Sequence, residues 1–246
     1  MSEKEKIARR IARAGICSRR EAEKLVEAGR VVVNGQRVET PAMRVAATDK
    51  VAVDGKELAA KEPAQLWRYH KPAGLVTTNS DEKGRMTIFD TFPADFPRVM
   101  TVGRLDMNTE GLLLLTNDGD LARYMELPET GWTRRYRVRV FGQVDEAALQ
   151  GLKRGIEIDG IKYKSIKAEL DEKQQGRNAW LSVALTEGKN REIRKVMEAL
   201  GLQVNRLIRI AYGPFQLGNL DKGVIEEVSK KALRSAISKN LADKIL

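Results

Sequence analysis

A continuous apolar run, from Leu112 through Leu115 to Thr116, lies between two polar turn segments and constrains the fold of this 246-residue chain more than any other feature. A short apolar run bounded by turn residues is typical of a strand buried on both faces. Other elements must then cover both sides of it, which predicts a central strand in a layered domain. The polar loop 103–111 leads directly into this strand, and rigid scaffolds often place catalytic side chains in such loops.

Further strand-like runs surround this one, with helical patterns between some of them. Helices are expected over residues 145–153 and 190–200, with Asn190 capping the second, and Asp120 is expected to cap a helix from Leu121. Successive strands with few helices favour a mixed, mainly antiparallel sheet with flanking helices over a doubly wound fold. The expected strands are 66–69, 75–78, 98–102, 112–116, 136–141, 161–170, 180–185 and 204–210.

The first sixty residues have the pattern of a separate small module. We therefore expect an α+β protein with two domains, 1–60 and 61–246. In the smaller domain, short strands are expected around the turn-forming pairs Asn34-Gly35 and Asp54-Gly55. The polar stretch 59–65 contains a proline and fits a linker between the two domains.

Two short helices are expected in the small module, over residues 4–14 and 19–28. Ser18 stands three residues before Glu21, which is the spacing of a capping box. Residues 1–20 carry seven basic and two acidic side chains. Such a cluster is either an ordinary solvated helix face or a surface that contacts nucleic-acid phosphates. The candidate RNA contacts are Arg9, Arg10, Arg13, Ser18, Arg19, Arg20 and Lys24.

Composition narrows the possible functions. The formal net charge of +10 suits a surface that binds a polyanion. Cys17 and His70 are the only residues of their types, so neither a disulfide framework nor a nitrogen–sulfur metal site is expected. The sequence has no apolar run of ~18 residues and no apolar signal core, which predicts a cytoplasmic protein that does not enter a membrane. Nucleotide-binding glycine motifs and the G-x-S-x-G motif are also absent, and no cofactor is expected.

Asp106, in the loop before the apolar run, has three interpretations: an ordinary turn residue, a calcium ligand or a catalytic carboxylate. Calcium binding is disfavoured, because the ninth and twelfth positions of the binding loop would be Leu114 and Asn117. A carboxylate in a sheltered cleft needs a nearby cation to remain ionised. Arg104 lies two residues away in the same loop.

Arg194 and Tyr136 are the other candidates. Arg194 is expected on the shoulder of the buried stripe of helix 190–200, with Arg191 pointing further outward. Arg194 is therefore either a surface arginine or the cation that pairs with Asp106. Tyr136 falls on the apolar face of its strand, where it is either a core residue or a ring that stacks on a base.

Longer motifs carry two family resemblances. Residues 11–38 resemble the alpha-L (S-four type) RNA-binding domain. Almost all of the rest is similar to the group of bacterial ribosomal pseudouridine synthases that contains the small-subunit enzyme and the large-subunit enzymes B, E and F, and looks closest to the B-type branch. The matching motifs are YHKPAG at 69–74, GRLD and its continuation at 103–122, YRV at 136–138, FGQVD at 141–145, EGKNREIR at 187–194 and LIRIAYG at 207–213.

The second resemblance implies roles for particular residues. Asp106 falls on the catalytic aspartate of the family, and Arg194 on the basic residue that pairs with it. Tyr136 falls on the family tyrosine, and Leu207 on the apolar residue that packs against the base. Arg104, in the same motif as Asp106, is expected to contact the substrate.

The implied activity is isomerisation of a uridine in ribosomal RNA to pseudouridine, with 23S rRNA as the expected target. The alternatives are the same reaction on 16S rRNA, and a non-catalytic rRNA-binding factor that assists ribosome assembly. Ribosomal RNA is the expected partner, with no membrane, small-molecule cofactor or metal involved. The chain is expected to be a monomer.

Overall fold

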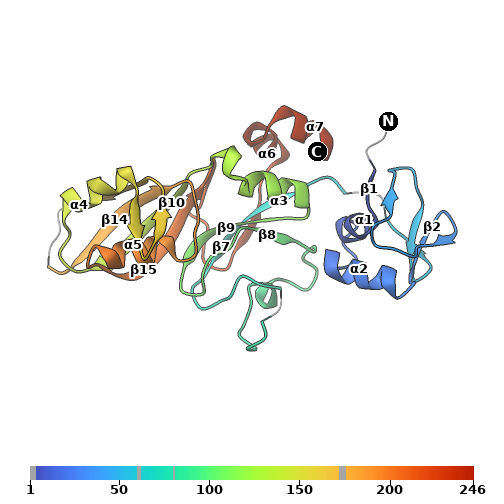
Figure 1. The fold of residues 1–246 in the computed structure, drawn as a ribbon, viewed down its shortest axis with the longest axis horizontal. Helices are drawn as coiled ribbons and strands as arrows, with labels where there is room; N and C mark the ends of the chain where they lie inside the picture. The colour runs from blue at the N-terminus through green and yellow to red at the C-terminus, as the bar shows by residue number, and fades with distance from the viewer. Residues whose placement is uncertain (1–3, 60–61, 80, 172–175) are drawn as a thin grey trace.

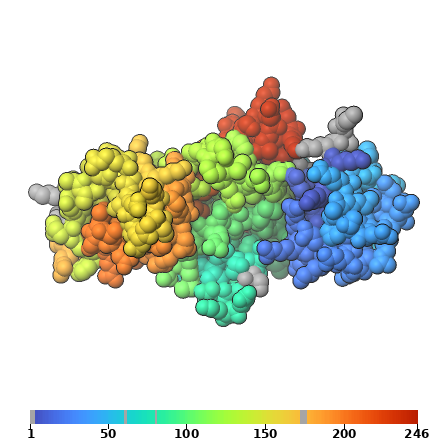
Figure 2. Space-filling model, viewed as in Figure 1, coloured from blue at the N-terminus to red at the C-terminus, as the bar shows by residue number. Residues whose placement is uncertain are grey.

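The computed structural model describes residues 4–59, 62–79, 81–171 and 176–246. Figures 1 and 2 show an elongated molecule in which the N-terminal segment forms a lobe at one end and a large sheet extends away from it. The expected α+β class is confirmed. Within the described chain, no helix is both long and apolar enough to span a membrane.

The N-terminal lobe begins with two helices, α1 (Ile7–Arg13) and α2 (Arg19–Glu27). The helix expected from residue 4 starts only at Ile7, because Glu5–Lys6 (β1) pairs as a strand with Arg44–Val45 (β4). The Ser18–Glu21 capping box at the start of α2 is present, as expected.

A four-stranded antiparallel sheet completes this lobe, in the order β3-β2-β5-β6. Its turns lie at the expected pairs, where Asn34 (φ 51°) and Asp54 (φ 53°) adopt left-handed backbone conformations, as type I′ turns require. Helices and sheet share a small apolar core centred on Ile7, Ile11 and Val26. The strands are Val31–Val33 (β2), Gln36–Arg37 (β3), Val51–Val53 (β5) and Lys56–Glu57 (β6).

A nine-stranded sheet organises the rest of the described chain. Seven strands follow the order β13-β14-β10-β15-β9-β7-β17, with β16 beside β15 and β8 beside β9. Only the β15–β9 pairing is parallel, so the prediction of a mainly antiparallel sheet is confirmed. The strands are Leu66–Lys71 (β7), Met100–Val102 (β8), Glu110–Thr116 (β9), Arg134–Phe141 (β10), Ile166–Leu170 (β13), Asn178–Leu185 (β14), Gln203–Tyr212 (β15), Phe215–Gln216 (β16) and Ile225–Glu227 (β17).

Strand β9 is buried on both faces, as the apolar run predicts. Leu112 and Leu114 pack into one hydrophobic cluster, and Leu113 and Leu115 pack into another on the opposite side. The first cluster lies beneath three helices, and the second includes aromatic residues from the segment between β7 and β8. The helices are α3 (Gly119–Glu126), α6 (Lys230–Ala236) and α7 (Lys239–Ile245), and a 3-10 turn, Phe89–Thr91 (η1), belongs to the aromatic side.

The other half of the sheet, from β13 to β15, packs against two helices over a third hydrophobic cluster. Strand β12 pairs with β11 in a separate hairpin beside this half. The elements are α4 (Glu146–Gly151), α5 (Glu192–Ala199), β11 (Ile156–Ile158), β12 (Ile161–Tyr163), and the 3-10 turns Pro128–Thr130 (η2) and Leu152–Arg154 (η3).

Two expected strands are wrong in detail. Residues 75–78 form a loop with a single isolated bridge, Val76 to Thr87, instead of a strand. Residues 161–170 are divided into two strands, because the backbone N–H of Lys164 donates to the carboxylate of Glu187 (2.6 Å) instead of to a strand neighbour.

Two expected helix caps are also wrong. Asp118, and not Asp120, caps α3, accepting from the backbone N–H groups of Asp120 (2.8 Å) and Leu121 (3.0 Å). Helix α5 starts after Arg191, whose φ of 52° turns the chain, and Asn190 does not cap it.

Candidate active site

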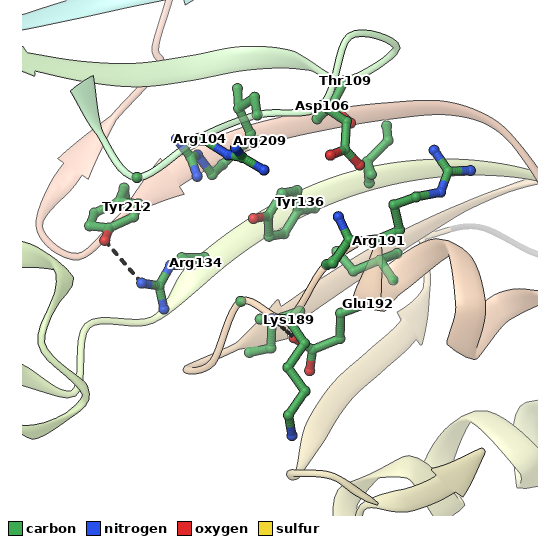
Figure 3. A pocket seen from close by; sticks show the side chains of 17 residues that line it. Arg104, Asp106, Thr109, Arg134, Tyr136, Lys189, Arg191, Glu192, Arg209 and Tyr212 are labelled. Carbon is green, nitrogen blue, oxygen red and sulfur yellow. Dashed lines mark hydrogen bonds between the residues drawn. The ribbon is translucent and has the colours of Figure 1, made fainter. Parts of the chain in front are cut away.

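A pocket of about 280 Å³ opens where the two halves of the large sheet meet. The loop before β9 forms one wall, strands β10 and β15 form the floor, and residues 188–193 form the opposite wall (Figure 3). This volume is near the lower end of the ~300–1,000 Å³ range of small-molecule sites. The pocket is therefore large enough for one base with its sugar.

Asp106 lies half-buried in this pocket, on a loop that Lys71 holds from below. Lys71 is fully buried, and its Nζ donates to the carbonyl oxygens of Asp106 (3.2 Å), Met107 (3.3 Å), Thr109 (2.9 Å) and its neighbour Pro72 (2.9 Å). Burial lowers the pKa of Lys71 to about 8, although the charge of Asp106 acts in the opposite direction. Lys71 thus fixes the backbone that presents Asp106.

The start of β9 is held as firmly as the loop. Glu110 forms ion pairs with Arg206 (Nη2–Oε2 3.1 Å) and Lys222 (Nζ–Oε2 2.8 Å), and its bond to Arg206 is the main reason that its pKa falls to about 2. Glu110 is therefore engaged in structure and not free to ligate calcium. Gly111, with φ 106°, lets β9 approach β15 closely, because a Cβ there would lie 2.3 Å from the carbonyl oxygen of Arg209.

Three side chains from β10 and β15 form the floor. Tyr136 and Leu207 are 8% and 6% exposed, and both belong to the hydrophobic core while lining the pocket. Tyr136 can therefore be both a core residue and a ring that stacks on a base. Arg209 lies directly across from Tyr136 in the antiparallel pairing of the two strands, and it is 2% exposed.

The structure places Arg194 behind the Asp106 loop and not in the pocket lining. Its Nη2 donates to the carbonyl oxygen of Asn108 (2.9 Å) and its Nη1 to that of Val204 (3.2 Å). Burial lowers the pKa of Arg194 and the charge of Arg191 adds to this, whereas the Asp106 carboxylate raises it. Arg194 therefore lies within electrostatic range of Asp106 and supports the loop through its backbone.

Arg191, expected to point outward, lines the pocket instead. The left-handed backbone at this position turns the residue away from the helical path on which that expectation was based. Arg191 and Arg104 are exposed and form a basic rim at the opening. The Lys189 ammonium extends away from the pocket (Figure 3) and pairs with Glu187 (3.0 Å).

Beneath the rim, a buried carboxyl group holds the wall that carries Lys189 and Arg191. Glu192 is 4% exposed and accepts from the backbone N–H of Lys189 (2.8 Å). Burial, together with the charge of Glu187, raises the pKa of Glu192 to about 7. Burial also acts to raise the pKa of Glu187, but hydrogen bonds from Lys164 and Lys189 lower it overall.

The candidate RNA contacts of the N-terminal lobe divide into two groups. On α1, Arg10 and Arg13 pair with Glu5, while Arg9 contacts both Glu5 (3.8 Å) and, across the lobes, Asp120. On α2, Ser18 caps the helix, and three exposed basic side chains face solvent, namely Arg19, Arg20 and Lys24.

Three side chains of the site, those of Lys71, Glu192 and Arg209, are not predicted by the sequence pattern. Lys71 lies in a motif quoted above, but nothing local distinguishes a lysine before a proline from a surface residue. Glu192 and Arg209 follow period-based patterns that predict only which face of an element they occupy. Among the described residues, no group of three or more His, Cys, Asp or Glu side chains is placed to hold a metal ion.

The pocket brings together an aspartate loop, a tyrosine and basic side chains, a combination suited to a polyanionic substrate. Residues 65–199 match the family model described as RNA pseudouridylate synthase, and residues 6–51 match the S4 domain. This chain belongs to the RNA pseudouridylate synthase family, whose members are isomerases, and carries an N-terminal S4 domain.

Individual relatives agree with this assignment. The chain is 46% identical to an uncharacterized RNA pseudouridine synthase of Rickettsia felis, over 93% of this chain and 99% of the relative. It is also 46% identical to the ribosomal large subunit pseudouridine synthase B of Salmonella typhimurium, over 87% of this chain and 75% of that protein. A crystal structure of a pseudouridylate synthase shares the fold, with a TM-score of 0.67 at 24% identity, and covers 94% of this chain and 99% of the other.

Proposed function

We propose that this enzyme isomerises a uridine of large-subunit ribosomal RNA, with Asp106 as its catalytic carboxylate. The observation that supports this most directly is the position of Asp106, which is presented by a rigidly held loop at the edge of a nucleotide-sized pocket. Its 46% identity to a large-subunit enzyme supports the choice of rRNA. Ribosomal RNA is its proposed partner, the cytoplasm its proposed location, and a monomer its proposed state.

The reaction breaks the bond between the ribose and N1 of uracil, and then joins the ribose to C5. Breaking the first bond develops positive charge on the sugar, which a carboxylate beside it stabilises. Asp106 either attacks the ribose or removes a ribose proton. The base must leave its stack to reach the pocket, where Tyr136 would stack against it and Leu207 would pack beside it.

The remaining proposed contacts position the RNA. Arg104 at the rim would contact the backbone next to the target uridine, and Arg194 would keep Asp106 in place and support its ionised form. We assign residues 1–60 to RNA binding and residues 61–246 to catalysis. In the first domain, Arg19, Arg20 and Lys24 face solvent and would contact phosphates, as would the α1 arginines where their internal pairs allow.

Replacing the carboxylate tests the proposal. Asp106→Asn should abolish isomerisation while the RNA affinity stays within about threefold, since most affinity comes from phosphate contacts elsewhere. The measurement is single-turnover conversion of an rRNA transcript, with binding measured in parallel. Asp145→Asn is the matched control, because asparagine also caps a helix and Asp145 is not among the residues that line the pocket. Turnover by Asp106→Asn would refute the assignment.

Mapping pseudouridines in rRNA from cells that lack this protein tests the target. One uridine should remain unmodified in 23S rRNA, and re-expression of the intact protein, but not of Asp106→Asn, should restore it. Loss of a 16S site instead would transfer the activity to small-subunit rRNA.

A further inference from the structure

Arg209 is a buried cation that has no role in the function proposed above. Its Nε donates to the carbonyl oxygen of Leu112 (2.7 Å), and its guanidinium lies 5.0 Å from the centre of the Tyr212 ring. Its Nη2 is buried without a hydrogen-bond partner among the described residues, and no acidic side chain there forms an ion pair with it. A buried charge with so few partners is costly, so its retention at a pocket indicates a ligand that completes its contacts.

The position of Arg209 separates it from the other arginines of the pocket. Arg104 and Arg191 are exposed at the rim, where the sugar–phosphate backbone of an entering RNA would lie. Arg209 is 2% exposed on the floor, directly across from Tyr136 in the strand pairing. Figure 3 shows Arg209 extending towards Tyr136 within the pocket. A base stacked on Tyr136 would therefore meet Arg209, whereas a phosphate would meet the rim.

The reaction creates a negative charge at this place. When the C1′–N1 bond breaks, its electron pair leaves with N1, so uracil departs as an anion with charge on N1 and its two carbonyl oxygens. The ribose is neutralised by bonding to the Asp106 carboxylate or by losing a proton to it. C5 then bonds to C1′ as the ester bond to Asp106 breaks or as Asp106 returns the proton to the ribose. The C5 proton is lost and N1 gains a proton, so the net change is an isomerisation and Asp106 is regenerated. Both routes leave the same charge on the base.

We propose that Arg209 is a catalytic residue that donates a hydrogen bond to a carbonyl oxygen of the uracil ring and stabilises the uracil anion. This inference rests on the proposed function of the pocket. Arg209 is almost completely shielded from bulk solvent, so its charge acts on a bound base with little screening by water. Its donors are held in advance by Leu112 and Tyr212, which avoids reorganisation during the reaction.

The test changes both the arginine and the leaving group. Two forms of the rRNA transcript carry uridine or 5-fluorouridine at the mapped site, and cleavage of the C1′–N1 bond is followed under single-turnover conditions. Fluorine withdraws electrons and makes uracil a better leaving group without help from the protein. Arg209→Gln should slow the uridine reaction about 100-fold, as the loss of one oxyanion donor does. With 5-fluorouridine, the factor by which Arg209→Gln slows the reaction should be at least about tenfold smaller.

Two matched variants complete the comparison. Arg209→Lys keeps the charge and should recover part of the rate. Arg104→Gln removes a rim arginine and should weaken RNA binding. The ratio of the single-turnover rate with 5-fluorouridine to the rate with uridine should stay the same as in the unsubstituted enzyme. An unchanged ratio in Arg209→Gln, or a loss confined to RNA affinity, would overturn the proposal and assign Arg209 to phosphate binding or to packing.

A structure of the unsubstituted enzyme bound to the 5-fluorouridine RNA covers the case in which Arg209→Gln does not fold. The Arg209 guanidinium should lie within hydrogen-bond distance of a uracil oxygen, and its contact with a phosphate or with protein alone would refute the inference. If the unsubstituted enzyme converts no uridine of the transcript, the proposed function fails. If it converts uridine but the ratio does not respond to Arg209, only this inference fails.

Discussion

The buried carboxyl group of Glu192 makes the stability of this enzyme depend on pH. Its pKa of about 7 in the folded chain lies above the usual value near 4.5, so the folded state binds a proton more tightly than the unfolded state between these values. Folding stability contributed by this group is therefore present below pH 4.5 and is lost as the pH rises towards 7. The wall carrying Lys189 and Arg191 should loosen over the same interval.

Glu192→Gln tests this dependence. Glutamine resembles the protonated carboxyl group, and its carbonyl oxygen can still accept from the N–H of Lys189. We expect the variant to be more stable than the unsubstituted enzyme by about 1–3 kcal/mol at pH 8, with little difference at about pH 4.5. Urea unfolding at both pH values measures this. Glu198→Gln, an exposed change on the same helix, is the control, and equal effects of the two variants at the higher pH would contradict the assignment.

At the scale of single residues, the sequence pattern predicted which residues lie at the site better than it predicted the contacts between their side chains. Asp106, Tyr136 and Leu207 line one pocket, as the motifs imply. Arg194 is half-buried, as its shoulder position predicts, but it contacts the backbone of the Asp106 loop. Arg191 lines the pocket instead of pointing outward, because a helical projection assumes regular backbone and Arg191 has a left-handed conformation. The wall around that turn combines a local bond, from the N–H of Lys189 to the Glu192 carboxylate, with a long-range bond from the N–H of Lys164 to Glu187, and no local pattern contains the second.

At the scale of elements, the loop between β8 and β9 depends on the strand beneath it. Lys71, at the end of β7, connects to three carbonyl oxygens of this loop, and the segment after it adds Gly74 N–H to Met107 (2.8 Å) and Thr77 Oγ1 to Leu105 (2.8 Å). The loop is thus held from one side by β7 and its extension. A change in β7 should therefore alter the geometry of the loop.

Lys71→Met should remove these bonds while keeping the apolar stem. The carbonyl oxygens of Asp106 and Met107 keep bonds from the N–H groups of Thr109 and Gly74, but those of Thr109 and Pro72 lose the Lys71 donor. An unsatisfied buried carbonyl oxygen costs about 1–3 kcal/mol, so we expect the melting temperature to fall and the single-turnover rate to drop at least about tenfold. RNA affinity should change little, because Lys71 is inaccessible to RNA. Lys167→Met, on the exposed face of β13, is the matched control and should change neither quantity. A variant of Lys71 with normal activity would show that the loop is held by its other contacts.

The elements that the sequence predicts well are those whose pattern is set locally. The run 112–116 became a strand with leucines packed alternately on two faces, and the Ser18–Glu21 box starts α2. The segment 75–78 forms a loop, since the Thr77 side chain contacts the active-site loop and the backbone of Val76 pairs with Met86 and Ile88 instead of with the sheet. Strand β17 and helices α6 and α7 were not predicted, because their patterns are short and their stability comes from packing on the sheet.

At the scale of the whole molecule, the two lobes have separate cores. The hydrophobic cluster of the N-terminal lobe contains only residues up to Leu58, and the three clusters of the remaining described chain begin at Ala64. Among the described residues, the ion pairs between the lobes are Arg9 with Asp120 and Arg98 with Glu21 (4.0 Å). Such partly exposed pairs contribute about 0–1 kcal/mol each, so they orient the lobes without being required for folding.

Deleting residues 1–58 should therefore leave a folded catalytic domain that binds rRNA more weakly. The deletion removes Arg19, Arg20 and Lys24, which face solvent on α2. Each phosphate contact contributes roughly 0.7–0.9 to the slope of log affinity against log salt, so the slope should become shallower by about 2. RNA affinity is measured at several salt concentrations from about 50 to about 200 mM, where such salt effects are large, and these values give the slope. A triple change of these side chains to glutamine in the full chain should produce the same shift, and an unchanged slope in both would exclude the N-terminal lobe as an RNA-binding surface.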